Sequence, residues 1–340
     1  MKESGLRAEL MGAFRQRVKA RFWEEAWGER MREHRRDPEA FAREVLGSRW
    51  WARQREVAEA VARHRRTAVK SANGVGKTYL AADLALWFLY SHAPSIVLTT
   101  APTWRQVRHV LWEEIGRRHR RARIPLPGAL LITRLMVKEG WFALGLATGT
   151  PDRFQGVHAE NILIILDEAS GVPDAIWEAA EGVAVGGNNK ILAIGNPLQA
   201  SGRFHEIFRS GTGWQRLTIS ALEHPNVTGA GEPIPGAVTA EAIDSRVGEW
   251  CAEVADGASF GCPPSSVEVF EWRGRRHRPN DLFRARVLGE FPLCDETALI
   301  PLAWIEAAQA RELAAEGLCR AAADVARFGG DSTVIGVRRG

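Results

Sequence analysis

Short apolar runs alternate with longer helix-like stretches through the middle of the chain. The apolar runs predict strands at 67–70, 95–100, 161–166 and 190–194. The stretches around them predict helices at 51–64, 77–90, 103–119 and 172–180. Strands 161–166 and 190–194 are apolar on both faces, which is typical of parallel strands covered by helices on both sides. The pattern therefore predicts an α/β fold with a mostly parallel sheet between helices.

Residues 1–48 form a different, N-terminal region that predicts helices. Residues 3–36 are rich in Arg, Glu and Ala. Asp37 then supplies an N-cap before a proline at the first helical position, and Gly47 ends that second helix.

The remaining segments are shorter or less regular. Residues 130–137 and 141–147 predict a hairpin within the core, and the Gly- and Pro-rich stretch after residue 220 predicts a small irregular subdomain or linker. Helical patches within that stretch are expected at 240–252 and 281–288, followed by a helix at 301–316 and strands at 318–325 and 332–337. We therefore divide the chain into an N-terminal segment (1–48), a core (49–220), a lid or linker subdomain (221–300) and a C-terminal part (301–340).

Charge is distributed unevenly. The formal net charge is +4, but residues 1–66 carry 17 Lys and Arg against 11 Asp and Glu, so the rest of the chain sums to −2. A basic segment favours a polyanionic partner, although a solvated amphipathic helix has the same composition. Only six of the 45 basic residues are lysine, so each lysine is worth inspection.

The chain contains no run of about 18 uncharged apolar residues, and its N-terminus lacks the apolar stretch of a signal peptide. Its four cysteines are far apart in sequence and form no CxxC pair. We therefore expect no membrane contact, free thiols and a cytoplasmic location.

A Gly-rich loop lies between the strand at 67–70 and the helix that starts at Lys77. It reads SANGVGKT and comprises Ser71, Ala72, Asn73, Gly74, Val75, Gly76, Lys77 and Thr78. The motif of phosphate loops is GxxxxGK[ST], with Ser71 here in place of the first glycine. The glycines let backbone N–H groups surround phosphates at the positive end of the helix. Lys77 is expected to reach the β- and γ-phosphates and Thr78 to ligate Mg²⁺; a purely structural turn is the alternative.

The strand at 161–166 ends in two acids, Asp167 and Glu168. Together with a phosphate loop, such a pair predicts that Asp167 holds Mg²⁺ through water and that Glu168 deprotonates the attacking water. Taken alone, the pair would suit any strand that runs into a helix. A catalytic Glu at this place favours ATP hydrolysis over phosphoryl transfer to a small molecule.

Two amides complete the predicted nucleotide site. Gln54 precedes the first strand, and its paired donor and acceptor can match the adenine edge, which favours ATP over GTP. Asn196 follows the strand at 190–194 and is placed to sense the γ-phosphate. An ordinary helix residue and a strand-ending turn are the respective alternatives.

With these motifs the sequence resembles the large subunit of bacteriophage terminases, the ATPase–nuclease that packages viral DNA. The resemblance is carried by 49–54 (RWWARQ), 69–78, 99–107 (TTAPTWRQV), 153–179, 194–204 (IGNPLQASGRF) and 324–335. It implies a P-loop NTPase core of the ASCE type with ATP and Mg²⁺ as cofactors. It also implies a homo-oligomeric ring that moves double-stranded DNA into a procapsid. The implied partners are a portal protein and a small terminase subunit, and the implied location is the bacterial cytoplasm and, transiently, the portal vertex.

The resemblance further implies an RNase H-like nuclease that uses Mg²⁺ or Mn²⁺. Asp324 matches its first carboxylate, with Asp331 as a candidate support; a hairpin with solvated acids is the alternative. The family's other carboxylates would lie beyond Gly340, so we expect the chain to carry the first hairpin of that fold, an incomplete metal site and no endonuclease activity.

Ring ATPases also need an arginine finger from a neighbouring subunit. The family places it just before the glycine that matches Gly156, where this chain has Gln155, so Arg153 is preferred over Arg105 and Arg108. For DNA, the basic runs 117–123 and 273–278 are candidates for phosphate contacts, and solvated surface is the alternative.

Two other functions fit the same motifs. A superfamily-2 helicase-like DNA-dependent ATPase would need a second RecA-like domain, for which residues after 220 show no pattern. A nucleotide-gated assembly module with little turnover would not need Glu168.

Overall fold

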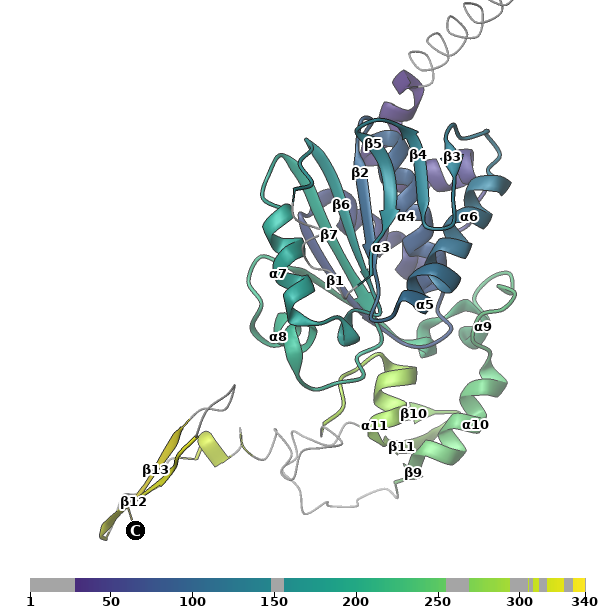
Figure 1. Cartoon of the computed structure of the whole chain (residues 1–340). Coiled ribbons are helices and arrows are strands. Elements are labelled where there is room, and N and C mark those ends of the chain that lie inside the picture. The colour runs from purple at the N-terminus through teal and green to yellow at the C-terminus, as the bar shows by residue number, and fades with distance from the viewer. Residues whose placement is uncertain are drawn as a thin grey trace, which may run out of the picture.

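The computed structural model describes residues 28–147, 156–254, 269–293, 305, 308–311, 317–326 and 333–339. Its centre is an eight-stranded sheet with the order β3-β4-β5-β2-β6-β7-β1-β8 (Figure 1). The strands are β1 (Arg66–Ser71), β2 (Ile96–Thr100), β3 (Ala129–Leu130), β4 (Arg134–Lys138), β5 (Trp141–Gly145), β6 (Asn161–Asp167), β7 (Asn188–Gly195) and β8 (Gln215–Ile219). Only the β3–β4 and β4–β5 pairs of this sheet are antiparallel. The predicted α/β fold with a mostly parallel sheet is confirmed.

Helices cover both faces of the sheet because its central strands are apolar on both sides. Along β6, Leu163 and Ile165 join one core cluster, whereas Ile162, Ile164 and Leu166 join the other. The first cluster includes α3 (Ala52–Arg63), α4 (Lys77–Ser91) and α6 (Trp112–Arg121). The second includes α7 (Asp174–Val183) and α8 (Gly202–Ser210). Between β2 and α6 the chain passes through α5 (Trp104–Gln106) and the π-turn η3 (Val107–Leu111).

The N-terminal segment packs on the first of these clusters. Residues 28–33 are helical, followed by the 3-10 turn η1 (His34–Arg36), α2 (Pro38–Phe41) and the π-turn η2 (Ala42–Leu46). Asp37 accepts a hydrogen bond from the Ala40 N–H, and Gly47 ends the segment with φ 74°, as the sequence predicted. The α2 residue Phe41 is fully buried in the same cluster as α4.

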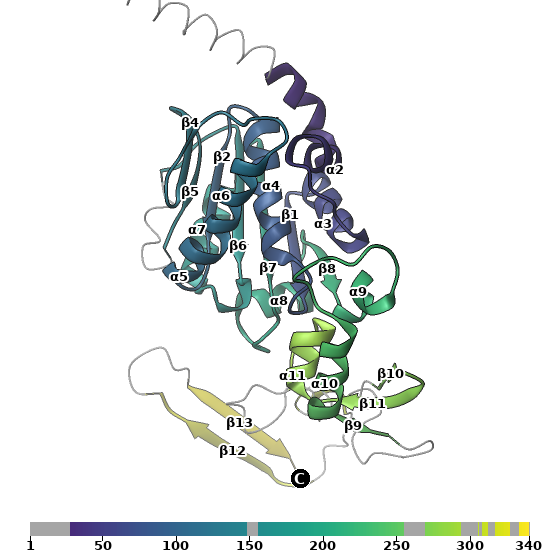
Figure 2. The same ribbon diagram turned by 90° about the vertical axis from the view of Figure 1, so that its right-hand side faces the viewer.

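The region after β8 is more regular than expected. It contains η6 (Ala221–Glu223), α9 (Pro225–Thr228), α10 (Ala240–Trp250), α11 (Asp281–Phe283) and the π-turn η8 (Arg284–Leu288). The predicted helical patches are confirmed. A three-stranded antiparallel sheet of β9 (Cys251–Glu253), β10 (Phe270–Trp272) and β11 (Arg275–Pro279) was not predicted. Neither were α8 and β8. Figures 1 and 2 place this subdomain below the end of the main sheet.

The C-terminal strands β12 (Cys319–Asp324) and β13 (Val334–Arg339) pair antiparallel as predicted. All residues of both strands are exposed, and Leu318 and Ile335 expose 82% and 69% of their surface. Most of the predicted helix 301–316 lies outside the described residues. Among the helices that the structure describes, none is both long and apolar enough to cross a membrane.

Candidate nucleotide site

Three adjacent parallel strands bring the predicted site residues together. In the sheet, β7 lies between β1 and β6 and pairs in parallel with both. The phosphate loop follows β1, Asp167 ends β6, and Asn196 follows β7. Ligands of open α/β sheets bind at the carboxyl ends of the strands, so this edge is the expected place for a site.

The phosphate loop has the backbone conformation that its glycines allow. Gly74 and Gly76 have φ of 73° and 84°, in the left-handed region that L side chains rarely adopt. A Cβ on Gly76 would lie 2.6 Å from Nε2 of Gln54, so a side chain has no room there. Gly76 is the N-cap of the fifteen-residue helix α4, whose first N–H groups face an incoming anion.

Lys77 is buried and connects two other parts of the site. Its Nζ donates to Oδ1 of Asn196 at 3.0 Å and to the Ala72 carbonyl at 3.2 Å, and it lies 3.9 Å from Oε1 of Glu168. Burial lowers the pKa of Lys77, while the nearby Glu168 and Asp167 carboxylates oppose that shift. A bound phosphate would place negative charge next to the buried Lys77 ammonium and so stabilise its charged form.

Asn196 is the centre of this hydrogen-bond network. Its Nδ2 donates to the Ser71 carbonyl at 2.6 Å, and its backbone N–H donates to Oε2 of Glu168 at 3.3 Å. Glu168 itself has φ 48°, a left-handed conformation that is uncommon outside glycine and asparagine. A Cβ on Gly195 would lie 2.6 Å from the Ala169 nitrogen, so β7 must end in glycine to let the Glu168 backbone come this close.

Asp167 is almost completely buried. The pKa of Asp167 is raised to about 7, chiefly by burial and also by the adjacent Glu168 carboxylate, while Lys77 acts in the opposite direction. A carboxylate held in such a place fits a divalent cation, because the cation would compensate the buried charge. The donor types of Asp167 and Thr78, a carboxylate and a hydroxyl, are oxygen ligands that suit Mg²⁺, which keeps several waters and takes few protein ligands.

Gln54 braces the phosphate loop. Its Nε2 donates to the Gly76 carbonyl at 3.1 Å, and its Oε1 accepts the Trp51 N–H at 3.3 Å. The Trp51 indole N–H donates to the Val75 carbonyl at 3.2 Å. The contact of Trp51 with the loop was not predicted from the sequence, and the predicted adenine contact of Gln54 stays a prediction.

A pocket of about 680 Å³ opens over the loop. Besides the predicted Gln54, Lys77, Thr78 and Glu168, it is lined by His224 and by residues 234–237 of the small subdomain. The Val238 N–H donates to the Gly74 carbonyl at 3.0 Å, and the rings of His224 and Trp51 are 5.1 Å apart. No periodicity marks this Gly- and Pro-rich segment, so the sequence offered no signal for its part in the site.

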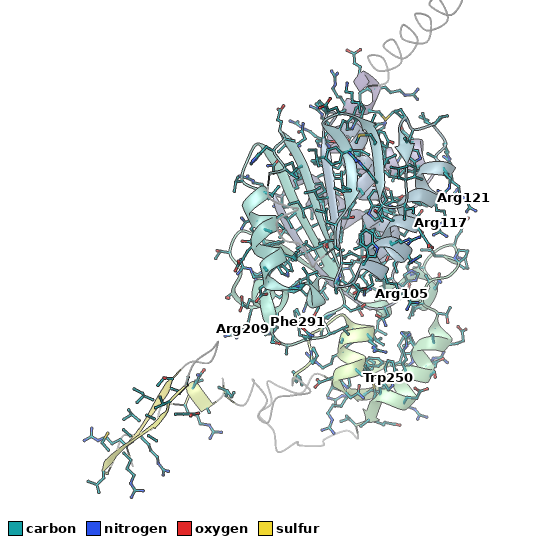
Figure 3. The ribbon with its side chains drawn as sticks, in the orientation of Figure 1. Arg105, Arg117, Arg121, Arg209, Trp250 and Phe291 are labelled. Atoms are coloured by element: carbon teal, nitrogen blue, oxygen red, sulfur yellow. The ribbon has the colours of Figure 1, made fainter. Side chains whose placement is uncertain are left out.

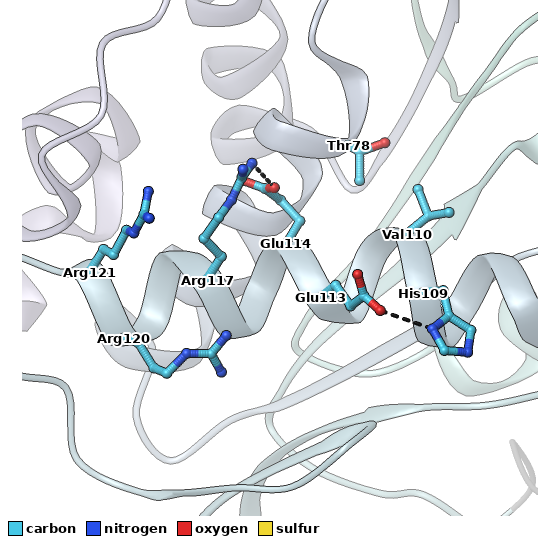
Figure 4. Close-up of a pocket in the computed structure, with 8 residues that line it drawn as sticks. All are labelled: Thr78, His109, Val110, Glu113, Glu114, Arg117, Arg120 and Arg121. Carbon is cyan, nitrogen blue, oxygen red and sulfur yellow. Dashed lines mark hydrogen bonds and ion pairs between the residues drawn. The ribbon is translucent and has the colours of Figure 1, made fainter. Parts of the chain in front are cut away.

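Helix α6 borders the same pocket with charged residues. Glu114 and Arg117 form an ion pair and line both the nucleotide pocket and a second groove of about 720 Å³. Figure 4 shows Arg117 and Arg121 extending from one side of α6 and Arg120 from the other, with Thr78 on the same side of the helix as Arg117. The groove therefore places arginines next to the predicted phosphate site.

Parts of the predicted DNA-contacting runs are engaged within the protein. Arg118 is largely buried and pairs with the fully buried Asp83 at 2.7 Å, and His277 is also buried. Arg273 pairs with Asp244. The candidates for DNA phosphate contacts in these runs are therefore the exposed residues, such as Arg117 and Arg121 (Figure 3).

Three other predicted residues, Arg105, Arg108 and Asp324, are not among those that line this pocket. Arg105 and Arg108 are exposed on α5 and η3, and neither is among the residues that line it. Arg153 and Asp331 lie outside the described residues. Asp324 is exposed on β12, and within the described ranges no three His, Cys, Asp or Glu residues are grouped as metal ligands would be.

A curated relative aligns with most of the chain, although no protein-family model matches. This relative, a probable terminase large subunit of Enterobacteria phage P7, is 26% identical over 257 residues, which are 73% of this chain and 46% of that protein. The chain thus spans about half the length of the relative.

The solved structures to which this chain is partly similar include two phage terminases. The large terminase of a thermophilic bacteriophage is 13% identical with a TM-score of 0.43, covering 51% of this chain and 46% of that one. The ATPase domain of the Thermus phage P74-26 large terminase is 19% identical with a TM-score of 0.40, covering 52% and 84%. The resemblance to phage terminase large subunits that the sequence indicated is confirmed by the P7 relative.

Proposed function

We propose that this chain is the ATP-hydrolysing motor subunit that moves double-stranded viral DNA into a procapsid. The observation that carries the proposal is the network of Lys77, Asn196 and Glu168 at the ends of adjacent parallel strands, beside the buried Asp167. The similarity to the P7 protein supplies the biological setting.

The phosphate loop binds the triphosphate. Backbone N–H groups around Gly74 and Gly76 and the Lys77 ammonium receive the β- and γ-phosphates, and Gln54 selects adenine. Thr78 and, through water, Asp167 would hold Mg²⁺, which neutralises phosphate charge when bound.

Glu168 acts on the water. Its carboxylate accepts a proton from the attacking water while the new O–P bond forms and the bond from the γ-phosphorus to the leaving ADP oxygen breaks. Asn196 contacts both Lys77 and Glu168, so a change at the γ-phosphate reaches Asn196 directly and, through its bond to Ser71, the start of the loop.

The finer features follow from the resemblance. The active form is a homo-oligomeric ring in which Arg153 of one subunit completes the site of the next. It acts in the bacterial cytoplasm at the portal vertex, with a portal protein and a small terminase subunit. Exposed α6 arginines contact DNA phosphates, and Asp324 contributes one carboxylate to a Mg²⁺- or Mn²⁺-dependent nuclease.

The decisive test is steady-state ATP hydrolysis by two variants. Lys77→Ala should abolish hydrolysis and weaken ATP binding. Glu168→Gln should bind ATP with nearly unchanged affinity but turn over at least ~10²-fold more slowly, because it loses only the group that takes the water's proton. Glu178→Gln, the same change at an exposed site on α7, is the control. Near-normal turnover in Glu168→Gln would contradict the ATPase assignment and favour a nucleotide-gated assembly module.

A further inference from the structure

A further pocket, of about 520 Å³, shares Glu168 and Asn196 with the proposed ATPase site. Its wall also includes Asn73 of the phosphate loop and the start of α5. Among the described residues that line it, Arg286 is the single cation. Arg286 belongs to the π-turn η8 of the small subdomain, and its side chain is exposed.

The backbone of η8 is fixed directly to the phosphate loop. The Arg286 carbonyl accepts the Asn73 N–H at 2.9 Å. At the end of the turn, a Cβ on Gly289 would lie 2.7 Å from the Ile219 carbonyl, which is itself the acceptor for the Ala72 N–H. These contacts fix the position of the Arg286 backbone relative to the phosphate loop of its own subunit.

A second attachment follows at once in sequence. Glu290 pairs with Lys70, the residue immediately before the phosphate loop. The Lys70 ammonium also lies 5.6 Å from the centre of the Phe291 ring. The segment that carries Arg286 is therefore held to β1 and the phosphate loop at two places, at Arg286 itself and just after the turn at Glu290.

We propose that Arg286 is a catalytic residue of this ATPase that acts within its own subunit. The proposal rests on the proposed function and deepens it. As water attacks, the O–P bond forms, the bond to the ADP oxygen breaks and the proton passes to Glu168. The Arg286 guanidinium donates hydrogen bonds to the γ-phosphate oxygens and keeps its own protons.

This role differs from that of an arginine finger. A finger reaches the site from a neighbour, whereas Arg286 is attached by its backbone to the loop of the same chain. The two arginines therefore give different results when defective subunits are mixed.

The first experiment measures turnover and binding of Arg286→Ala, Arg286→Lys and the control Arg216→Ala. Arg216 is an exposed arginine of β8 that donates to the Phe208 carbonyl. Without DNA, Arg286→Ala should lower kcat by about 10²-fold, as loss of one donor to a transition state does. Arg286→Lys should recover part of that loss, Arg216→Ala should match the wild type, and all melting temperatures should agree, because only an exposed side chain is removed.

Calorimetry gives a readout that does not need turnover. The wild type should bind ATP-γ-S more tightly than ADP, and Arg286→Ala should lose most of that preference while its affinity for ADP stays the same. An unchanged kcat or an unchanged preference would overturn the role of Arg286. Loss of activity in Arg286→Ala with normal activity in Lys77→Ala would instead contradict the proposed function.

The second experiment mixes Arg286→Ala with Lys77→Ala protein over a range of ratios. Because Arg286 serves its own subunit, the mixture should show no more activity than the two proteins measured apart. Recovery of activity on mixing would overturn action within one subunit.

Discussion

Asp167 and Lys77 show how burial tunes single residues of the site. The pKa of the Asp167 carboxyl is raised to about 7, chiefly by burial, and burial lowers the pKa of the Lys77 ammonium. Both charges are therefore costly in the absence of ligand, and both are of the sign that Mg²⁺ and phosphate would compensate. These uncompensated charges lower the free energy of unfolding of the ligand-free protein. Binding of Mg²⁺ and phosphate would relieve that cost and would therefore be tighter.

Asp167→Asn should make the nucleotide-free protein more stable, and more so as pH rises. The folded state keeps the Asp167 proton up to about pH 7, whereas the unfolded chain releases it near 3.8. The wild type therefore loses stability as pH rises through this window, and the amide does not. We expect the melting temperature of Asp167→Asn to exceed that of the wild type by about 2 °C or more at pH 8, and the difference to vanish near pH 4.

The control for this experiment is Asp174→Asn, at an exposed position in the first turn of α7. It should shift the melting temperature little. If the increase in melting temperature of Asp167→Asn were the same at every pH, the pKa of the Asp167 carboxyl would not be raised in the folded state, and the prediction would be wrong.

At the scale of elements, one buried ion pair joins three segments beside the loop. Asp83 of α4 accepts from Nε of Arg118 of α6 at 2.7 Å and from the Trp50 indole at 3.0 Å. Arg118 also donates to Ser48, and its guanidinium lies 4.5 Å from the centre of the Tyr79 ring. The pair thus aligns the phosphate-loop helix with α6 and with the segment that leads to Gln54.

Arg118→Met should destabilise the protein by about 3–5 kcal/mol, because it leaves the Asp83 carboxyl buried without its partner. The double variant Asp83→Asn with Arg118→Met should recover most of that loss, since the neutral amide still accepts from Trp50. Urea unfolding of the two variants and the wild type measures both effects. Equal stability of the single and double variants would mean that the charge of Asp83 is already neutralised.

The elements that sequence predicted are those whose pattern is strong. Strands such as β6 and the helix after the phosphate loop are long, apolar and bounded by chemistry-bearing residues, and their order alone brings Asp167, Asn196 and Lys77 to one edge. By contrast, β8 is only partly buried at the sheet edge, and β9 to β11 are short and mostly exposed, so neither shows a clear alternation. The contacts of Trp51, Val238 and Arg286 were missed because they depend on tertiary placement of backbone groups.

At the scale of the whole molecule, the small subdomain completes the nucleotide site. Residues 234–237 line the pocket over the phosphate loop. Val238 donates to the Gly74 carbonyl, and Arg286 of η8 accepts from the neighbouring Asn73 N–H. Arg53 of α3 pairs with Glu223, which gives a further link between core and subdomain. Each subunit therefore forms the nucleotide pocket from its own residues. In the proposed ring, a neighbouring subunit would add only the arginine finger, Arg153.

If Arg153 acts across a subunit boundary as proposed, ATPase activity should rise with protein concentration. Arg153→Ala and Lys77→Ala proteins should each be slow alone, and mixing them should restore part of the activity. Each active site then combines an intact Lys77 with an Arg153 from its partner. Steady-state hydrolysis across mixing ratios is the measurement; folded proteins that show no recovery at any ratio would argue against Arg153.

Plasmid DNA should not be cut by this 340-residue polypeptide with Mn²⁺ or Mg²⁺. Two-metal cleavage needs several carboxylates around cations about 4 Å apart, and the described Asp324 is exposed on a two-stranded hairpin. Digestion by the wild type is compared with that by Asp324→Ala. Cutting that disappears in the variant would show a complete site.

The attachment of η8 to the phosphate loop also has a consequence for the order in which the chain becomes competent during synthesis. Lys70 and Glu290 are 220 residues apart in sequence. The acceptors of the Ala72 and Asn73 N–H groups, the Ile219 and Arg286 carbonyls, are likewise far along the chain. Contacts between residues so distant in sequence form after local ones, and a ribosome delivers the N-terminal partner first. A nascent chain that has not reached Glu290 can hold α4 and β1 but not the finished loop. Nucleotide binding should thus appear late in translation, when the small subdomain has been made.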